Sequence, residues 1–343
     1  MGLGWEAEWR YPKLGRVMRR RDFIAGITGL SAAWPLAAHA QQPAQRAKIG
    51  ILYPGLASAM PSRIAALRDG LQAVGYREPD NVEFVVRSTG GDPTRTMPLA
   101  IELVERKVDV ILAASAPAVN AARSATTTIP IVALDLESDP VGSGLISSLS
   151  RPGGQVTGIF FDFPDFSKKW LELLKEAIPK LGSIAVLWEP ATGPVHIKAV
   201  EIAAKELNVK VEIMDVPGIS NLDDSIFAAS GKGVDAILML SSALIGANAE
   251  YLAGLTLGLR LPAVTLFPDF ARRGGLMAYG INTVNIFRQS APIIAKVLRG
   301  AKPGEVPAEL PTKFELVINL KTAKRLGIVF PTSILLRADE VIE

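Results

Sequence analysis

Two serines in this sequence occupy matching positions at the ends of predicted strands. Ser115 ends the apolar phrase VDVILAAS (residues 108–115), and Ser241 ends the similar phrase VDAILMLS (residues 234–241). A serine in front of a helix can cap it through its hydroxyl, or it can hold a ligand carboxylate together with the free backbone N–H groups of the helix. Both interpretations are open for each serine alone, and their matching positions favour a shared ligand site.

Aromatic and acidic side chains also lie at or near the predicted ends of strands. Aromatic rings there can enclose a flat or apolar ligand; packing between domains is the alternative, and we expect it for at least two of the rings. The carboxylates can pair with a ligand ammonium in a charge-assisted bond worth about 1.5–3 kcal/mol, or they can cap helices or belong to a hinge. With the serines and the loop residues beside them, the predicted ligand site consists of Tyr53, Ser58, Ser115, Ala116, Pro117, Asp135, Phe161, Asp162, Trp188, Glu189, Ser241, Phe267 and Tyr279.

Several classes of enzyme and metal site are excluded by residues that the sequence lacks. It has no cysteine, which rules out disulfides, thiolate metal sites and cysteine nucleophiles. The nucleotide-binding patterns G-x-G-x-x-G and G-x-x-x-x-G-K-[ST] and the nucleophile pattern G-x-S-x-G are absent. We expect His196, at the start of a predicted helix, to face solvent or to cap that helix. We therefore predict no catalytic residue, no metal and no cofactor.

The excess positive charge of the chain is concentrated at its amino-terminal end. The formal net charge is +3, but six of the 37 basic and three of the 34 acidic residues lie within residues 1–40. The remaining chain holds 31 residues of each sign and has no basic excess with which to bind a phosphate backbone. Nucleic acid is therefore not an expected partner.

Residues 18–41 have the anatomy of an export signal. Met18 is followed by a basic start, an apolar stretch and the small-residue ending Ala38-His39-Ala40, so cleavage is expected after Ala40. The pair Arg20-Arg21 resembles a twin-arginine signal. A membrane anchor is the alternative, but residues 24–38 are short and interrupted by glycine and proline. We expect Met18 to be the true start and the mature protein to be periplasmic, with no stable insertion into the membrane.

From residue 48 the chain alternates buried strands with amphipathic helices. KIGILYP and VDVILAAS predict strands, and PSRIAALRDGLQAVG has apolar residues at helical spacing. Such alternation predicts parallel sheets with right-handed crossovers. The pattern then repeats, since SIAVLWEP (183–190) aligns with KIGILYPG (48–55), and Asp235 aligns with Asp109 at an offset of 126 residues. The predicted fold class is α/β, with two Rossmann-like lobes in tandem.

The last part of the chain is too short for a third domain, and we expect it to complete both lobes. After an upstream extension and export signal over residues 1–40, we predict lobe 1 over residues 47–161 plus about 283–302, and lobe 2 over residues 163–280 plus about 306–343. Several crossovers between two lobes form a hinge and a cleft. Because ligands bind beyond the carboxyl ends of parallel strands, both lobes are expected to present their candidate residues to this cleft.

Several longer phrases resemble the ABC transporter substrate-binding proteins, and within them the group similar to tryptophan- and tyrosine-binding members. They are DVILAASAPAV, TTTIPIVALDLESDPVGSGL, SLSRPGGQVTGI, GGLMAYG and PTKFELVINLKTAKRLGI. The resemblance covers essentially all of residues 18–343. It implies a type I periplasmic binding protein fold, with three crossovers and a ligand in the hinge cleft.

The same resemblance implies a small ligand, either amino-acid-like or an aromatic carboxylate, which a monomeric receptor delivers to a membrane ABC permease in a transient contact. The alternative is a periplasmic sensing module that reports to a membrane signalling protein. Both would share one fold, and a fold alone does not decide between functions.

Overall fold

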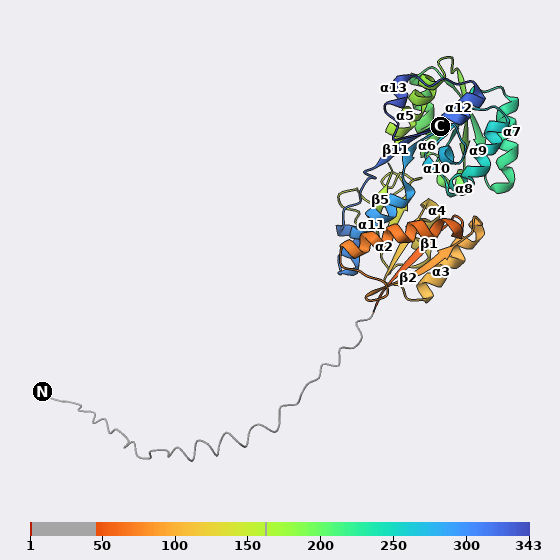
Figure 1. Ribbon diagram of the computed structural model, residues 1–343. Helices are drawn as coiled ribbons and strands as arrows, with labels where there is room; N and C mark the ends of the chain where they lie inside the picture. Colours follow the sequence, from red (N-terminus) through yellow and green to blue (C-terminus); the bar gives the residue numbers. More distant parts are fainter. Residues whose placement is uncertain (2–45, 162) are drawn as a thin grey trace, which may run out of the picture. The chain divides into compact units, whose positions relative to one another are not determined.

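The computed structural model describes residues 46–161 and 163–343, together with Met1 (Figure 1). The predicted export signal and the candidate Asp162 lie outside these described residues. Residues 46–343 form one compact unit whose strands assemble into two separate sheets. Within the described ranges, no helix is both long enough and apolar enough to cross a membrane.

The first sheet is built from the residues up to Phe160. Its elements are β1 (Ala47–Tyr53), η1 (Ala57–Ala59), α2 (Met60–Ala73), β2 (Val82–Ser88), η2 (Pro93–Arg95), α3 (Thr96–Glu105), β3 (Val110–Ala114), α4 (Ala116–Ala125), β4 (Ile131–Asp135) and β5 (Val156–Phe160). The five strands are parallel and lie in the order β2-β1-β3-β4-β5. The order reverses between β1 and β3, and ligands of such sheets bind beyond the strand ends at this reversal.

The second sheet repeats this arrangement and extends it. Its elements are α5 (Phe163–Ala177), β6 (Ser183–Trp188), η3 (Pro190–Thr192), α6 (Val195–Glu206), β7 (Lys210–Asp215), η4 (Ile219–Asn221), α7 (Leu222–Gly231), β8 (Ala236–Met239), α8 (Ala243–Ala247), α9 (Ala249–Gly258), β9 (Ala263–Thr265), α10 (Pro268–Arg272) and β10 (Met277–Ile281). The strands β7-β6-β8-β9-β10 repeat the order of the first sheet, and two later strands continue the sheet beyond β10.

The remaining chain crosses to the first sheet and then returns. Its elements are α11 (Thr283–Leu298), η5 (Pro303–Glu305), β11 (Phe314–Asn319), α12 (Leu320–Leu326), α13 (Thr332–Leu335) and β12 (Glu340–Ile342). Helix α11 packs along α2 on the first sheet. The backbone up to Glu309 also pairs there, since the Phe160 N–H donates to the Glu309 carbonyl at 3.0 Å. We call the first sheet with α2, α3, α4 and α11 lobe 1, and the second sheet with its helices lobe 2.

The predicted repeat is visible in one matching polar contact in each lobe. The Asp109 carboxylate accepts a hydrogen bond from the Lys48 N–H at 2.6 Å, at the start of β1. The Asp235 carboxylate accepts bonds from the N–H groups of Gly182 and Ser183, both at 2.9 Å, at the start of β6. In both lobes an aspartate in front of the third strand therefore holds the beginning of the first strand.

The predicted parallel pairing holds for all strands from β1 to β10, and a strand from the last part of the chain departs from it. Strand β11 runs antiparallel to β10, with Phe314 opposite Ile281 and Ile318 opposite Met277. The reason is the path of the chain, because β10 ends where the chain leaves lobe 2, and β11 begins at that same side when the chain returns. A strand that re-enters beside the end of its neighbour must run in the opposite direction.

An aromatic cluster packs where the chain passes between the lobes. The centre of the Phe166 ring lies 4.3 Å from the ring centre of Phe161, 4.6 Å from that of Phe314 and 5.4 Å from that of Tyr279. Trp170, which is fully buried, donates its indole N–H to the Tyr279 carbonyl at 2.6 Å. Aromatic pairs of this kind add about 0.5–1.5 kcal/mol each beyond the area that they bury, so the cluster fixes the crossovers to the core of lobe 2.

Candidate ligand site between the two lobes

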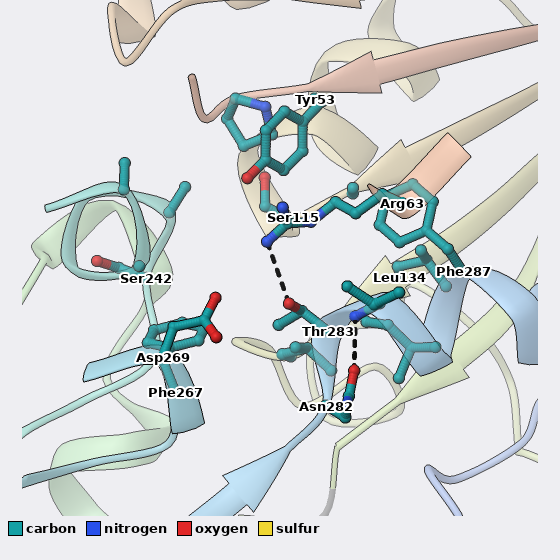
Figure 2. Close-up of a pocket in the computed structure, with 18 of the residues that line it drawn as sticks. Tyr53, Arg63, Ser115, Leu134, Ser242, Phe267, Asp269, Asn282, Thr283 and Phe287 are labelled. Atoms are coloured by element: carbon teal, nitrogen blue, oxygen red, sulfur yellow. Dashed lines mark hydrogen bonds between the residues drawn. The ribbon is translucent and has the colours of Figure 1, made fainter. Parts of the chain in front are cut away.

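A cavity lies between the strand ends of the two sheets (Figure 2). It encloses about 860 Å³, part of it open to solvent. Lobe 1 lines it with the residues that follow β1, β3 and β4, and lobe 2 with α8, α10 and the residues in front of α10. The crossover from β10 to α11 closes one side. The polar and aromatic lining residues are Tyr53, Arg63, Ser115, Glu137, Ser242, Phe267, Asp269, Arg272, Asn282, Thr283 and Phe287.

The wall from lobe 1 is formed at the reversal of the strand order. Tyr53 ends β1, and Ser115 stands between β3 and α4. The hydroxyl of Ser115 caps α4 by accepting a hydrogen bond from the Ala118 N–H at 3.3 Å. The backbone of Ser115 has φ +129°, a region that residues with a Cβ rarely adopt. Such strain costs about 1–3 kcal/mol and concentrates at functional sites.

The wall from lobe 2 combines a helix cap, an aromatic ring and a carboxylate. Ser242 caps α8 by accepting a hydrogen bond from the Ile245 N–H at 3.1 Å. Phe267 is half-buried, and Asp269, in the first turn of α10, keeps 59% of its side chain exposed. Figure 2 shows the Asp269 carboxylate on the side of the cavity opposite Tyr53 and Arg63. The two lobes therefore bring opposite charges to one space.

Arg63 supplies the cavity with a cation that has no carboxylate partner among the described residues. It projects from α2, donates one hydrogen bond to the Ala59 carbonyl at 2.8 Å and one to the Thr283 hydroxyl at 3.1 Å. Its guanidinium lies 5.2 Å from the centre of the Tyr53 ring. Burial raises the pKa of Tyr53, Arg63 opposes this rise, and Asp269 adds to it. The Tyr53 hydroxyl thus lies in the field of both charges.

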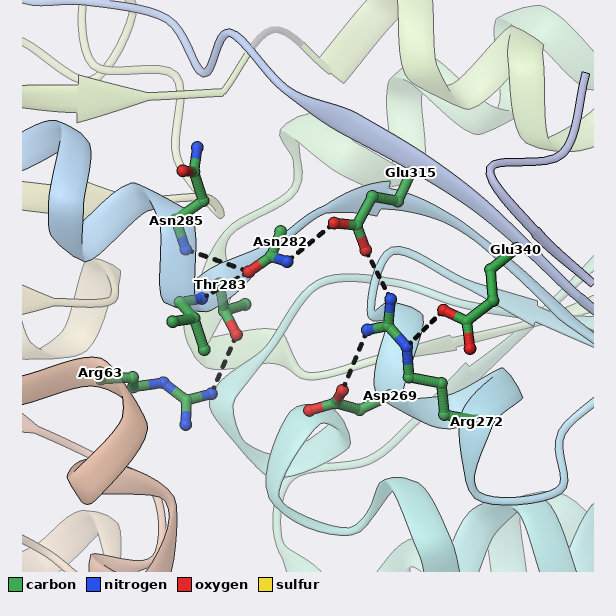
Figure 3. Close-up of polar contacts among 9 residues, drawn as sticks. Arg63, Asp269, Arg272, Asn282, Thr283, Asn285, Glu315 and Glu340 are labelled. Carbon is green, nitrogen blue, oxygen red and sulfur yellow. Dashed lines mark hydrogen bonds and ion pairs between the residues drawn. The ribbon is translucent and has the colours of Figure 1, made fainter. Parts of the chain in front are cut away.

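The second arginine of the cavity is held by carboxylates (Figure 3). Arg272 donates to Glu315 and to Glu340, each at 2.8 Å, and lies 3.4 Å from Asp269. Burial lowers the pKa of Arg272, but the hydrogen bonds to Glu315 and Glu340 outweigh it and raise the pKa above its ordinary value. Asn282 joins this network by donating to Glu315 at 2.7 Å. The charge of Arg272 is therefore compensated, whereas that of Arg63 is not.

Glu137 is a buried carboxyl on the inner side of the cavity. It is 4% exposed and accepts a hydrogen bond from the Ala116 N–H, at the start of α4, at 2.7 Å. Burial raises the pKa of Glu137 above its ordinary value of 4.5, and the neighbouring Asp135 raises it further. Asp135 itself is buried and accepts bonds from the N–H groups of Glu137 and Ser138. The two carboxyls therefore belong to one buried turn after β4.

The expectation that His196 faces solvent or caps a helix is wrong. Its side chain is fully buried on α6, and its Nε2 contacts the carbonyl oxygen of Glu137 across the boundary between the lobes. Burial lowers the pKa of His196 to about 4. The helix start that looked exposed in the sequence is covered by the other lobe, which a pattern within one segment does not reveal.

Comparison with known proteins decides the family of this chain. The sequence model described as ABC transporter substrate binding protein matches residues 48–342. The chain belongs to this family. A curated relative is the tyrosine-binding protein of Clostridioides difficile (strain R20291), which is 28% identical over 278 residues, covering 80% of this chain and 78% of the relative.

Solved structures show the same architecture for this substrate-binding protein. The ABC domain from Streptococcus pneumonia in complex with L-Trp has a TM-score of 0.80 and 26% identity, covering 87% of this chain and all of that one. A conserved domain protein from Vibrio cholerae has a TM-score of 0.80 and 28% identity, and the match again covers 87% of this chain and all of the other. More distant periplasmic binding proteins, such as one from Alkaliphilus metalliredigens at 11% identity and TM-score 0.52, share the fold. The fold is that of a type I periplasmic binding protein, as the sequence predicts.

The structure brings together only some of the predicted site residues. Tyr53, Ser115 and Phe267 line the cavity between the lobes, and Pro117 and Glu189 line a second cavity beside it. Ala116 contributes its N–H to the Glu137 carboxyl rather than a lining side chain.

Other predicted residues lie elsewhere. Ser58 is exposed on η1, Trp188 donates its indole N–H to the Gly193 carbonyl, and Ser241 is buried one residue before the lining Ser242. Phe161 and Tyr279 belong to the aromatic cluster at the crossovers, and Asp135 to the buried turn.

Seven polar residues of the cavity are absent from the predicted set. Arg63, Asp269 and Arg272 project from helices, and Asn282 and Thr283 lie where the crossover enters α11. Glu137 and Ser242 follow strands. The rule that ligand residues follow strands does not reach helix side chains. For Glu137, the phrase DLESD was a usable signal, since it places one acidic residue at the end of β4 and two more directly beyond it.

Proposed function

We propose that this protein is the exported receptor of an ABC importer and that it captures a free aromatic amino acid between its lobes. The observation that carries the proposal is the pairing, in one cavity, of the uncompensated Arg63 with Asp269 on the opposite wall. A zwitterion matches such a pair, because its carboxylate and its ammonium each find an opposite charge.

The carboxylate of the ligand is assigned to Arg63. A guanidinium has five N–H donors, and two of them are used by Ala59 and Thr283. The remaining donors suit a carboxylate, which arginine binds with directed, charge-assisted hydrogen bonds. Arg272 is a poorer choice because Glu315 and Glu340 already occupy it.

The aromatic side chain of the ligand is assigned to the rings of the cavity. Tyr53 and Phe287 line it from lobe 1, and Phe267 lines it from lobe 2. Leu134, Leu136 and Ile286 add apolar surface. Apolar cavities with a few placed polar groups are the usual form of small-molecule sites, and the ligands named for the tyrosine-binding and L-Trp-bound relatives fit this chemistry.

Family membership supports the remaining parts of the proposal. Receptors of this family serve ABC transporters, so we assign this monomeric receptor to the periplasm, with export by the twin-arginine route, cleavage after Ala40 and delivery to a membrane permease. We assign it no catalytic activity, because the proposed site is a site of capture.

Thermal unfolding with a ligand panel tests this function. We expect L-tyrosine, L-tryptophan or L-phenylalanine to raise the melting temperature, since a ligand at 100 times its Kd stabilises the fold by about 2.7 kcal/mol. Benzoate and phenethylamine, which carry one charge each, should bind more weakly. If the two single-charge compounds bind as tightly as the amino acids, the zwitterion assignment is wrong.

Arg63→Gln should weaken amino-acid binding by about 10- to 100-fold in calorimetry, the equivalent of a charge-assisted hydrogen bond. Arg68→Gln is the matched control, because Arg68 lies on the same helix but pairs with Glu78 at 2.6 Å on the surface. Equal effects of the two substitutions would contradict the role of Arg63.

A further inference from the structure

A second cavity adjoins the first on the side of the lobe boundary away from the crossovers. The space that it spans, including the part open to solvent, is about 1180 Å³. It is lined from lobe 1 by residues after β1, β2 and β4 and from lobe 2 by residues after β6, β7 and β8. Four residues line both cavities, namely Pro54, Glu137, Ala243 and Ala247. We call them the inner and the outer cavity.

The partition between the two cavities on the lobe 2 side consists of small side chains. Ala243 and Ala247 are four residues apart on α8 and therefore share one face of this helix. Both are half-buried and line both cavities. Since neither side chain extends beyond Cβ, a group that passed along α8 from one cavity into the other would meet only two methyl groups of this helix.

The outer cavity differs from the inner one in its charges. Its described lining includes no arginine, lysine or histidine, and its ionisable groups are Asp92, Glu137 and Glu189. Asp92 is engaged in capping η2, whereas Glu189 is half-buried, and burial raises its pKa. Leu56, Pro117, Pro217 and Leu244 supply apolar surface. Such a lining favours an apolar group that ends in a cation and disfavours an anion.

We propose that the two cavities together bind a short peptide with an aromatic residue at its carboxyl end. The C-terminal carboxylate lies at Arg63 and the aromatic ring in the inner cavity. The preceding residue passes Ala243 and Ala247, and its free ammonium enters the outer cavity near Glu137 and Glu189. One further residue adds about 3.5 Å of chain. This inference rests on the proposed function, because it uses the same carboxylate anchor.

Calorimetry with three defined probes tests the inference. L-Phenylalanine occupies the inner cavity alone, alanyl-phenylalanine occupies both, and N-acetyl-phenylalanine has the extension without the ammonium. We expect alanyl-phenylalanine to bind at least about tenfold more tightly than N-acetyl-phenylalanine, the equivalent of one charge-assisted bond. Glu189→Gln should reduce this preference and leave the affinity for L-phenylalanine unchanged.

Leu244→Trp tests the outer cavity directly, because Leu244 lines this cavity and not the inner one. The larger indole ring fills the space that the preceding residue needs, so the variant should weaken the binding of alanyl-phenylalanine by about tenfold or more and leave the binding of L-phenylalanine within about threefold. The control is Ala65→Phe, on the exposed face of α2 and outside both linings. Ile219→Trp, which also lines the outer cavity alone, provides a second variant, and the melting temperature of each variant shows whether it folds.

The outcomes separate this inference from the proposed function. If L-phenylalanine binds and alanyl-phenylalanine does not, the peptide assignment is overturned while the amino-acid receptor stands. Equal losses of affinity for both ligands in Leu244→Trp would also overturn it. If neither ligand, nor L-tyrosine or L-tryptophan, stabilises the protein, both proposals are overturned.

Discussion

The two lobes share a strand order but differ at the loop that faces the ligand. In lobe 1, Ser115 follows β3 directly, caps α4 and has φ +129°. In lobe 2 the aligned Ser241 is buried, and the next residue, Ser242, caps α8 with an extended backbone at φ −160°. One additional residue in the second loop removes the strain. The comparison teaches that the repeat preserves the scaffold, while the residues that contact the cavity have diverged.

The largest expected loss of stability comes from replacing one glycine in the fifth strand of each lobe. Gly158 in β5 and Gly280 in β10 are both followed by isoleucine, and an added Cβ would lie 2.1 Å from the Ala133 carbonyl oxygen and 2.0 Å from the Leu266 carbonyl oxygen, respectively. Gly158 also has φ +146°. We expect Gly158→Ala to destabilise the fold by more than about 4 kcal/mol, and Gly280→Ala by somewhat less, because its backbone is not strained.

Urea denaturation measures both changes. Gly231→Ala at the end of α7 is the control, since an added Cβ there meets open space, and it should change stability by less than about 1 kcal/mol. If the Gly158→Ala protein is as stable as this control, the close approach of β4 to Gly158 does not require glycine at that position, and the likeness between the two fifth strands is lost.

The next largest effect is a dependence of folding stability on pH, which arises from His196 at the contact between the lobes. The pKa of His196 is about 4 in the folded protein and 6.5 when the residue is unperturbed. The unfolded chain therefore binds the additional proton between these values, so stability falls as pH decreases from about 6.5 to about 4. The full loss is about 3 kcal/mol. Denaturation curves of His196→Gln should lack this part of the pH dependence.

Glu137 lies on the lobe 1 side of the same contact, and its titration lowers the folding stability as the pH rises rather than as it falls. Because burial raises its pKa, its contribution to stability is complete below about pH 4.5 and is lost as the pH rises. Glu137→Gln should remove this loss at neutral and alkaline pH. A pH profile that is the same in wild type and in both variants would contradict the burial of this pair.

The smallest effect concerns the two capping serines. Ser115→Ala loses the cap and keeps the strain, and should cost about 1 kcal/mol. Ser115→Gly also loses the cap but relieves the strained φ, so it should be the more stable of the two by about 1 kcal/mol. At Ser242, whose backbone is extended, the alanine and glycine variants should differ less. If the alanine and glycine variants differ in stability by the same amount at both serines, the backbone strain is not specific to lobe 1.

The sequence allowed the scaffold to be predicted better than the site. The alternation of strands with helices follows from periodicity within each segment, and the duplication follows from the repeated phrases around Asp109 and Asp235. Tyr53, Ser115 and Phe267 were found because they lie at or just beyond the ends of strands. Arg63 and Asp269 were missed because their role depends on which helices face each other across the lobes. His196 was misjudged for the same reason.

The position of α11 has a consequence for how the protein is made. This helix lies on lobe 1 with Phe287 and Ile294 buried in the core, yet it begins at residue 283, after all of the strands from β6 to β10. During synthesis, the lobe that emerges first therefore lacks one of its covering helices until more than 120 further residues have been added. Contacts between such distant segments form slowly, and the first half of the chain completes its fold only after the second half has emerged.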